Sequence, residues 1–199
     1  MKKFELTNEF VTNMFGTKLF RIRALVEFGD VEAGELGGYV EKESNLGHDD
    51  NAWVYDNAWV YGNARVYGDA LVYDNARVYD NAWVYGDAQV SGDARVYDNA
   101  RVYGDAWVYG NARVCGDALV CGDARVCGNG DYAYAHGFGS VNRTTTFFRL
   151  KDGGVGVRCG CFYGTLAQFR DKIRETHGET KKAQEYLMLA DLMKLRFEK

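Results

Sequence analysis

Apolar and polar positions recur with a six-residue period through the middle of the chain. From Ala52 to Asn129 the sequence is built of thirteen hexads of the form Ala-x-Val-y-(Gly/Asp)-(Asn/Asp). Alanine and valine are two residues apart, so they face one side of an extended strand, while x and y face the other. Glycine, asparagine and aspartate tolerate turn and left-handed backbone. Each hexad therefore predicts a short strand followed by a corner.

Corners repeated without strand reversal make a coil rather than a flat sheet. Three hexads per turn give a triangular prism with valine inside, alanine beside it, and Asn and Asp side chains hydrogen-bonding along the corners. Earlier in the chain, Gly38, Val40, Ser44 and Leu46 keep the small–large inward pattern, and a longer corner follows at 48–50. We expect a mainly β protein with a parallel β-helix of about five coils.

This period divides the chain into three parts. Residues 38–130 form the repeat, 1–37 an N-terminal β cap, and 131–199 a tail, because a solenoid needs its end coils covered. In the N-terminal part Phe20, Ile22 and Ala24 alternate with polar residues as in a half-buried strand, and Phe4 and Leu6 indicate a partner strand.

Residues 18 apart stack on the same outer face of the prism. The first face carries Trp53, Leu71, Gln89, Trp107 and Arg125 beside Tyr55, Tyr73, Ser91, Tyr109 and Cys127. The second carries Trp59, Arg77, Arg95 and Arg113 beside Tyr61, Tyr79, Tyr97 and Cys115. The third carries Arg65, Trp83, Arg101 and Leu119 beside Tyr67, Tyr85, Tyr103 and Cys121. Tyrosines are expected to form ladders. The first face is the least charged, and its Trp53, Tyr55, Trp107 and Tyr109 are candidate contacts between subunits.

The tail predicts a ββαα unit. Two strands flank Asp152-Gly153-Gly154, a hairpin signal. We expect Phe148 and Leu150 to face Val157 and Cys159, with Arg149 and Arg158 on the opposite face together with Phe147.

Two helices are predicted to follow this hairpin. Thr165 and Gln168 form a capping box at the start of a helix that ends near 177–178. A second helix over 181–197 is apolar nearly all round, which indicates burial or a partner chain. Its Met188, Leu192 and Leu195 are candidate oligomer contacts.

The segments FRIRA at 20–24, GELGGYVEKE at 34–43, the hexads, and TTTFFRLKDGG with CGCFYGTL in the tail carry a family resemblance. The chain resembles hexapeptide-repeat left-handed parallel β-helix proteins of bacteria and prophages that are labelled polymer-forming or transferase-like. The left-handed sense comes from this resemblance.

Charge is unevenly distributed. Residues 1–51 hold 6 basic and 10 acidic side chains, residues 52–129 again 6 and 10, and residues 130–199 hold 12 and 8. A basic tail on an acidic body favours an anionic ligand.

Tail residues supply the candidate ligand site. Arg143, Arg149, Arg158 and Arg170 provide positive charge, and the helix start at Thr165 offers free N–H groups. Phe147 and Tyr163 are candidates to stack a base. Alternation separates Tyr163 from Arg158, so these two need not converge in one monomer, and an oligomer could bring them together. The alternative is that Arg149 and Arg158 pair with local carboxylates such as Asp171 or Glu175.

Three function classes remain open. The favoured one is a non-enzymatic homo-oligomer, a trimer by preference, that sequesters a small phosphate-bearing, nucleotide-like molecule, with small phage proteins as an analogy. A structural or protein-interaction scaffold is the alternative. A CoA-dependent acyltransferase would need a histidine base in a cleft, and the chain offers His48, His136 and His177. No cofactor and no duplex DNA partner are expected, because corner aspartates offset the arginines of the second face.

Five cysteines complete the inventory. Cys115, Cys121 and Cys127 point from three different faces and cannot share one metal ion within a monomer, and Cys159 and Cys161 are expected to be core thiols. Reduced thiols and the absence of an apolar leader or span predict a cytoplasmic protein with no membrane partner.

Overall fold

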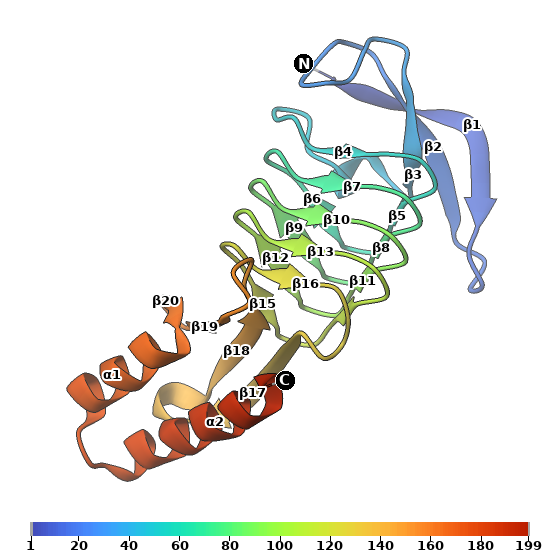
Figure 1. Ribbon diagram of the computed structural model, residues 1–199. Helices are drawn as coiled ribbons and strands as arrows, with labels where there is room; N and C mark the ends of the chain where they lie inside the picture. The colour runs from blue at the N-terminus through green and yellow to red at the C-terminus, as the bar shows by residue number, and fades with distance from the viewer. Residues whose placement is uncertain (1, 199) are drawn as a thin grey trace.

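The computed structural model describes residues 2–198 and shows an elongated molecule with a coil of parallel strands at its centre (Figure 1). The first face consists of β4 (Trp53–Val54), β7 (Leu71–Val72), β10 (Gln89–Val90), β13 (Trp107–Val108) and β16 (Arg125–Val126). The second face contains β5 (Trp59–Val60), β8 (Arg77–Val78), β11 (Arg95–Val96) and β14 (Arg113–Val114). The third contains β6 (Arg65–Val66), β9 (Trp83–Tyr85), β12 (Arg101–Tyr103) and β15 (Leu119–Val120). The predicted parallel β-solenoid is confirmed; its left-handed sense stays a prediction.

The interior of the coil is filled as the hexad pattern predicts. The alanines and valines of the hexads, from Ala52 to Val126, are at most 1% exposed. The prediction fails at Ser44, which is exposed, because residues 43–45 form a short 3-10 helix that turns Asn45 inward. The Asn45 amide donates to the carbonyl oxygens of Gly62 and Ala64 and accepts from Lys42 N–H, so this buried polar group is paired.

Side-chain ladders hold the corners together. Asn63, Asn81, Asn99 and Asp117 form a chain of amide hydrogen bonds along one corner. Along the corner between the first and second faces, carboxylates accept from backbone N–H groups of the next turn. Asp56 accepts from Asp74 and Asp74 from Gly92, and on the corner between the second and third faces Asp98 accepts in the same way from Gly116. These three aspartates have positive φ, which confirms the left-handed corners.

The N-terminal strands continue the second face. β1 (Phe4–Thr12) pairs antiparallel with β2 (Lys18–Ala24), which pairs with β3 (Leu36–Val40), and β3 runs parallel to β5. Phe4 and Phe28 pack edge-on against Trp53, whose side chain is fully buried. This cluster closes the first coil, as expected of a cap.

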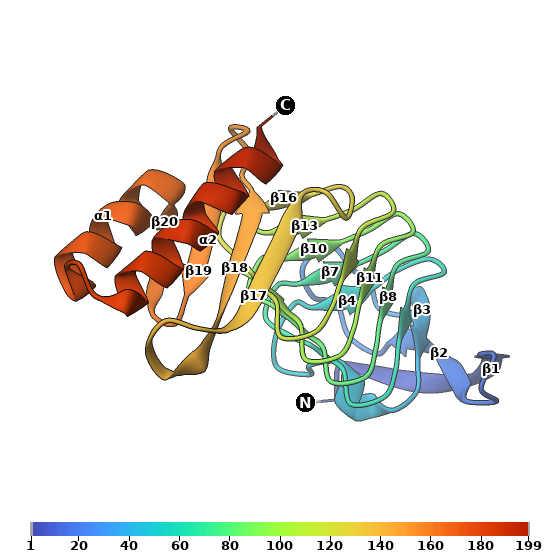
Figure 2. The same ribbon diagram turned by 90° about the horizontal axis from the view of Figure 1, so that it is seen from below.

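The tail is larger than the predicted ββαα unit. It contains four antiparallel strands, β17 (Tyr132–Phe138), β18 (Arg143–Arg149), β19 (Val155–Cys159) and β20 (Phe162–Thr165), followed by α1 (Leu166–His177) and α2 (Lys181–Phe197). A short 3-10 helix, η2 (Ser140–Asn142), joins β17 to β18. The strands β17 and β20 were missed because their apolar alternation is short and interrupted by glycine. The helices cover one side of this sheet, and the other side meets the end of the coil (Figure 2).

The tail closes the last coil through side-chain hydrogen bonds. The buried Thr146 hydroxyl accepts from Leu119 N–H at 2.9 Å, and the Tyr132 hydroxyl donates to the Arg113 carbonyl at 2.6 Å. Strand N–H and C=O groups that a further coil would have paired are thereby satisfied.

Among residues 2–198, the structure contains no helix of the length and hydrophobicity that a membrane span requires.

Candidate binding site

Arg149 and Arg158 do not share a strand face, so this prediction was wrong. Phe147 lies opposite Val157 and Arg149 opposite Val155, across a hairpin loop of residues 150–154. A one-residue change in register moves side chains to the other face. Arg149 points toward the helices and donates to the Phe197 carbonyl, whereas Arg158 lies 5.9 Å from the Tyr103 ring on the coil.

The same register determines which way the neighbouring side chains face. Phe148 faces the coil while Val157 packs under the helices, so the two do not face each other as expected. Phe147 is fully buried and meets Phe169 edge-on at 6.1 Å. A ligand base therefore has no access to Phe147, and the prediction of stacking there was wrong.

Tyr163 and Arg158 lie directly opposite each other on β20 and β19. The expectation that alternation separates them was wrong, and a single chain brings them together. Tyr163 is 43% exposed and its ring lies parallel to that of Phe148 at 6.5 Å.

The remaining tail candidates lie in separate places. Thr165 and Gln168 form the predicted capping box. Arg170 is paired with Asp191. Asp171 and Glu175 pair with Arg174 and Lys172 rather than with Arg149 or Arg158.

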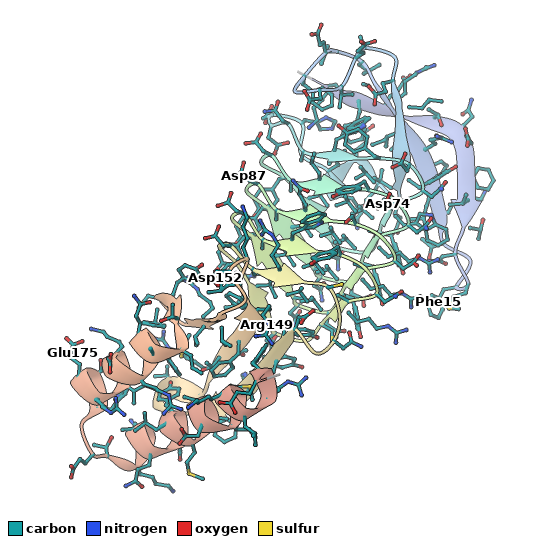
Figure 3. All side chains as sticks on the ribbon, viewed as in Figure 1. Phe15, Asp74, Asp87, Arg149, Asp152 and Glu175 are labelled. Atoms are coloured by element: carbon teal, nitrogen blue, oxygen red, sulfur yellow. The ribbon has the colours of Figure 1, made fainter. Side chains whose placement is uncertain are left out.

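Arg149 and Thr165 line one shallow groove of about 380 Å³, but Asp152 and Glu198 line it too and oppose an anion there. Figure 3 shows Arg149 and Asp152 near the junction of coil and tail. The tail candidates thus do not form one site.

Of the predicted subunit contacts, some are buried within the chain and others are exposed to solvent. Trp53 is wrong as a contact, because the N-terminal cap buries it. Tyr55 packs partly against the core, and the Trp107 indole donates to Ser91 Oγ and packs against Tyr109. On α2, the apolar side chains that face solvent are those of Met188, Leu192 and Leu195, which are 71%, 54% and 70% exposed.

The cysteines are all free thiols. Cys121 is buried and Cys127 is exposed, while Cys115 lies 3.7 Å from the Tyr132 hydroxyl. Cys161 is exposed at the β19–β20 turn, so the expectation of two core thiols fails there, and Cys159 is half-buried. Among the described side chains, no group of three or more histidine, cysteine or acidic residues could hold a metal ion.

The three histidines lie apart from one another. His48 stacks on Phe4 in the N-terminal cap. His136 contacts the Thr144 hydroxyl on the tail sheet, and His177 lies at the end of α1 beside Tyr186.

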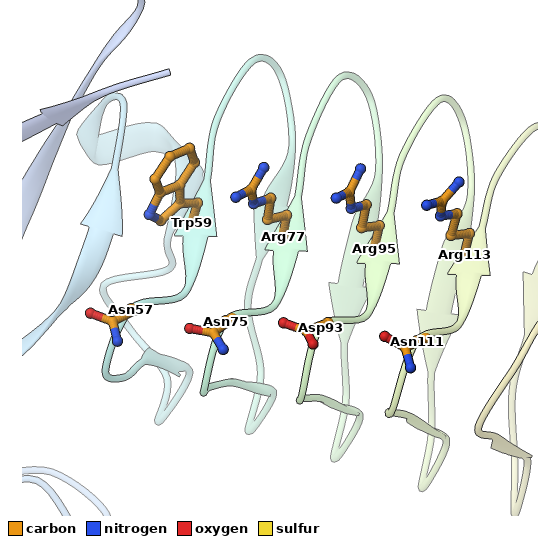
Figure 4. A pocket seen from close by; sticks show the side chains of 8 residues that line it. All are labelled: Asn57, Trp59, Asn75, Arg77, Asp93, Arg95, Asn111 and Arg113. Atoms are coloured by element: carbon orange, nitrogen blue, oxygen red, sulfur yellow. The ribbon is translucent and has the colours of Figure 1, made fainter. Parts of the chain in front are cut away.

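The strongest candidate site lies on the second face of the coil. Arg77, Arg95 and Arg113 occupy equivalent positions of β8, β11 and β14, where parallel pairing aligns them in one row. Figure 4 shows this row continuing from Trp59, with a second row of corner residues, Asn57, Asn75, Asp93 and Asn111, alongside. The two rows line a groove of about 440 Å³. We call the three arginines the arginine row.

The arginine row carries three positive charges against the single carboxylate of Asp93 in the same groove. Within residues 2–198, none of its members forms an ion pair, although Arg77 lies 4.4 Å from the centre of the Trp59 ring. The neighbouring corner carboxylates of Asp74 and Asp98 are instead bound to backbone N–H groups. The 18-residue spacing correctly predicted that these arginines stack. The site was not predicted, because the corner aspartates were expected to neutralise the arginines.

Tyrosine rings flank the arginine row. Tyr61, Tyr79 and Tyr97 stack with centroids 5.0 Å apart and nearly parallel planes, which confirms the predicted ladder. Burial raises the pKa of Tyr61 to about 12, and a hydrogen bond to Cys115 together with burial raises the pKa of Tyr97 to about 12. The ladder is therefore neutral at physiological pH and offsets none of the arginine charge.

An exposed apolar hairpin tip borders the same face. Met14 and Phe15, at the β1–β2 turn, are 89% and 81% exposed. With Trp59, Tyr61 and Tyr79 they line a groove of about 820 Å³ that also includes Arg77 and Arg95. Phe15 projects at the outer edge of the molecule (Figure 3). Apolar, positive and acidic groups, the last from Glu41 and Asp80, thus border this groove, which shares Trp59, Arg77 and Arg95 with the groove of the arginine row.

A family model matches the repeats of the coil. Residues 58–74, 70–86, 88–104, 94–110, 106–122 and 112–128 match the family described as the YdcK beta solenoid repeat. The repeat of this chain is thus similar to that of a β-solenoid repeat family, and the matches include neither the N-terminal cap nor the tail. No curated protein matches the chain.

Proposed function

We propose that the protein is a non-enzymatic binding scaffold that holds an anionic, phosphate-bearing molecule on the arginine row. One observation carries the proposal: three arginines in consecutive coils share one groove and make no ion pair among the described residues. The β-solenoid supplies the rigid frame that fixes their spacing.

Like charges held this close favour an anion between them. Neighbouring strands of a sheet are about 4.8 Å apart. Two unit charges near that distance repel by a few kcal/mol at the dielectric of a protein surface. A bound anion replaces this repulsion with attraction, and guanidinium groups match phosphate oxygens geometrically.

The amide groups of Asn57, Asn75 and Asn111 add neutral hydrogen-bonding partners along the groove. Phe15 and Met14 give an apolar or planar part of the ligand a surface to contact. A nucleotide-like molecule combines these chemistries, so we place the predicted ligand class on the coil rather than in the tail. Holding such a molecule without converting it amounts to sequestration, and the free thiols fit the reducing cytoplasm.

The test compares two double variants of equal charge change, with tripolyphosphate as the probe. Arg77→Gln/Arg95→Gln removes two neighbours of the arginine row. Arg65→Gln/Arg101→Gln removes two arginines of the third face that lie on either side of Trp83. We expect the first to weaken binding by about tenfold or more, as loss of charge-assisted hydrogen bonds does, and the second to leave it nearly unchanged.

Calorimetry with tripolyphosphate and then with ATP measures both affinities. Equal losses in the two variants would mean unspecific attraction, and no binding by the natural chain at millimolar probe would overturn the proposal.

Self-association through α2 is a second candidate function, as part of a scaffold. Met188, Leu192 and Leu195 lie three or four residues apart, so they form one apolar stripe facing solvent. We propose that this stripe joins copies of the chain into a homo-oligomer, a trimer by preference.

Sedimentation tests this assembly. Leu192→Lys/Leu195→Lys should produce monomers, while the exposed control Gln184→Lys should not. Truncation after Gly178 is less informative, because it also removes the buried side chains of Tyr186, Ala190 and Phe197. A natural chain that is monomeric at micromolar concentration would contradict the assembly.

A further inference from the structure

A hollow between α1 and the tail sheet is separate from the arginine row. It has a volume of about 250 Å³. Its apolar lining comes from Phe162 on β20, Phe169 and Ile173 on α1, and Tyr186 on α2. The last three are each 3% exposed, so they form the floor of the hollow, while Phe162 is half-buried at its side. Apolar walls with a few polar groups are typical of small-molecule sites.

The rim of this hollow is basic. Arg143, Lys172 and His177 line it, and among the described residues neither aspartate nor glutamate does. Lys172 is engaged by Glu175 at 2.9 Å, whereas Arg143 makes no ion pair within the described chain. Arg143 lies close over Gly160, where an added Cβ would collide with its guanidinium. Gly160 has φ +58°, a conformation that also favours glycine, so the turn leaves space for the arginine.

Polar groups at the floor are already paired with one another. The Thr145 hydroxyl donates to Cys159 Sγ at 3.2 Å, and this thiol lies 3.8 Å from the Tyr186 hydroxyl. The floor therefore needs no polar ligand atom as a hydrogen-bond partner, and the Arg143 guanidinium at the rim is the group suited to bind a negative charge.

We propose that this hollow binds a small aromatic carboxylate, with its ring against Phe162 and Ile173 and its carboxylate on Arg143. Guanidinium binds carboxylate through two parallel hydrogen bonds, and the volume suits a molecule of one or two rings. The site does not depend on the proposed function of the coil.

The experiment uses 1-naphthoate and its neutral analogue 1-naphthamide with the full chain. Cys161 lines the hollow, whereas the exposed Cys127 lies on the coil. We expect 1-naphthoate to slow alkylation of Cys161 but not of Cys127, followed by mass spectrometry of the peptides. The amide should protect Cys161 much less, because it lacks the charge that Arg143 recognises.

Charge variants complete the test by calorimetry. Arg143→Gln should weaken 1-naphthoate binding by about tenfold or more. The control Arg174→Gln removes an α1 arginine that lies outside the hollow and pairs with Asp171. The proposal is overturned if Cys161 is not protected, if acid and amide bind equally, or if both variants lose affinity alike. Arg77→Gln/Arg95→Gln should retain 1-naphthoate binding, which separates this site from the arginine row.

Discussion

At the scale of the residue, each hexad position has a separate physical task. Val90 is fully buried and lies between Val72 and Val108 of the neighbouring coils. Asp87, three residues earlier, is exposed at a corner. The chemical demands on neighbouring positions therefore differ sharply, although the repeat makes them look uniform along the sequence.

Val90→Asp tests the inward position. An unpaired carboxylate would be buried among methyl groups, so we expect a loss of about 3 kcal/mol or more in the free energy of unfolding. Denaturant unfolding followed by circular dichroism measures it. The control Asp87→Asn should change stability by no more than about 0.5 kcal/mol. A small effect at Val90 would show that water reaches the interior.

The stacked tyrosines predict instability in alkali. Their hydroxyl pKa values are raised in the folded state, to about 12 for Tyr61, mainly by burial. Unfolded tyrosine ionises near pH 10. Above that pH the unfolded chain has lost protons that the folded chain retains, so the free energy of unfolding falls as pH rises.

Lys3 makes the free energy of unfolding rise with pH, since burial lowers its pKa in the folded state. It is a single group, so the effect of the several stacked tyrosines should dominate. Urea unfolding at rising pH, with tyrosinate absorbance as the titration signal, checks the slope. Tyr61→Phe should make it shallower, and a flat profile in the natural chain would contradict the argument.

At the scale of the element, sequence patterns predicted the repeated strands and the helices, but they did not predict the register of the tail hairpin. The strands of the coil and both helices follow from periodicity, and α2 spans 181–197 as predicted. The β18–β19 register did not, because the hairpin signal at residues 152–154 does not fix which residues pair; the observed pairing of Arg149 with Val155 puts Arg149 and Arg158 on opposite faces. The candidate site was predicted in the tail and lies on the coil for a related reason. The sequence does not show that a corner carboxylate such as that of Asp74 binds a backbone N–H group instead of an arginine.

The tail sheet predicts a measurable capping contribution. Thr146→Val keeps the shape of the buried side chain but leaves the Leu119 N–H without its acceptor, which should cost about 1–3 kcal/mol. Thermal unfolding measures this loss. Thr144→Val, on the same strand and bound to the exposed His136, should have little effect. Equal effects of both changes would remove Thr146 from the cap.

At the scale of the whole molecule, two covered ends enclose a regular interior. Trp53 lies under the N-terminal cap, and Thr146 and Tyr132 bind the last coil. Open end-to-end stacking of coils is therefore disfavoured in this chain. The proposed association through the exposed stripe on α2 would leave both caps in place.

The corner hydrogen bonds join residues 18 apart, so a deletion changes both the length of the coil and which residues stack on each face. Deleting 76–93 removes one full turn and should leave Trp59 aligned with Arg95 and Arg113, which keeps tripolyphosphate binding in a shorter protein. Deleting only 76–81 removes a third of a turn and leaves the interior equally well filled. Every outer position after the deletion then advances by one face, and Trp59 is followed by Trp83, Arg101 and Leu119. The smaller deletion keeps Arg95 and Arg113 one turn apart but moves both off the face of Trp59, Met14 and Phe15. Tripolyphosphate binding should therefore survive, whereas any additional affinity for ATP from that apolar edge should be lost. Stability should change little, because the interior repeats every six residues while the outer surface repeats every 18.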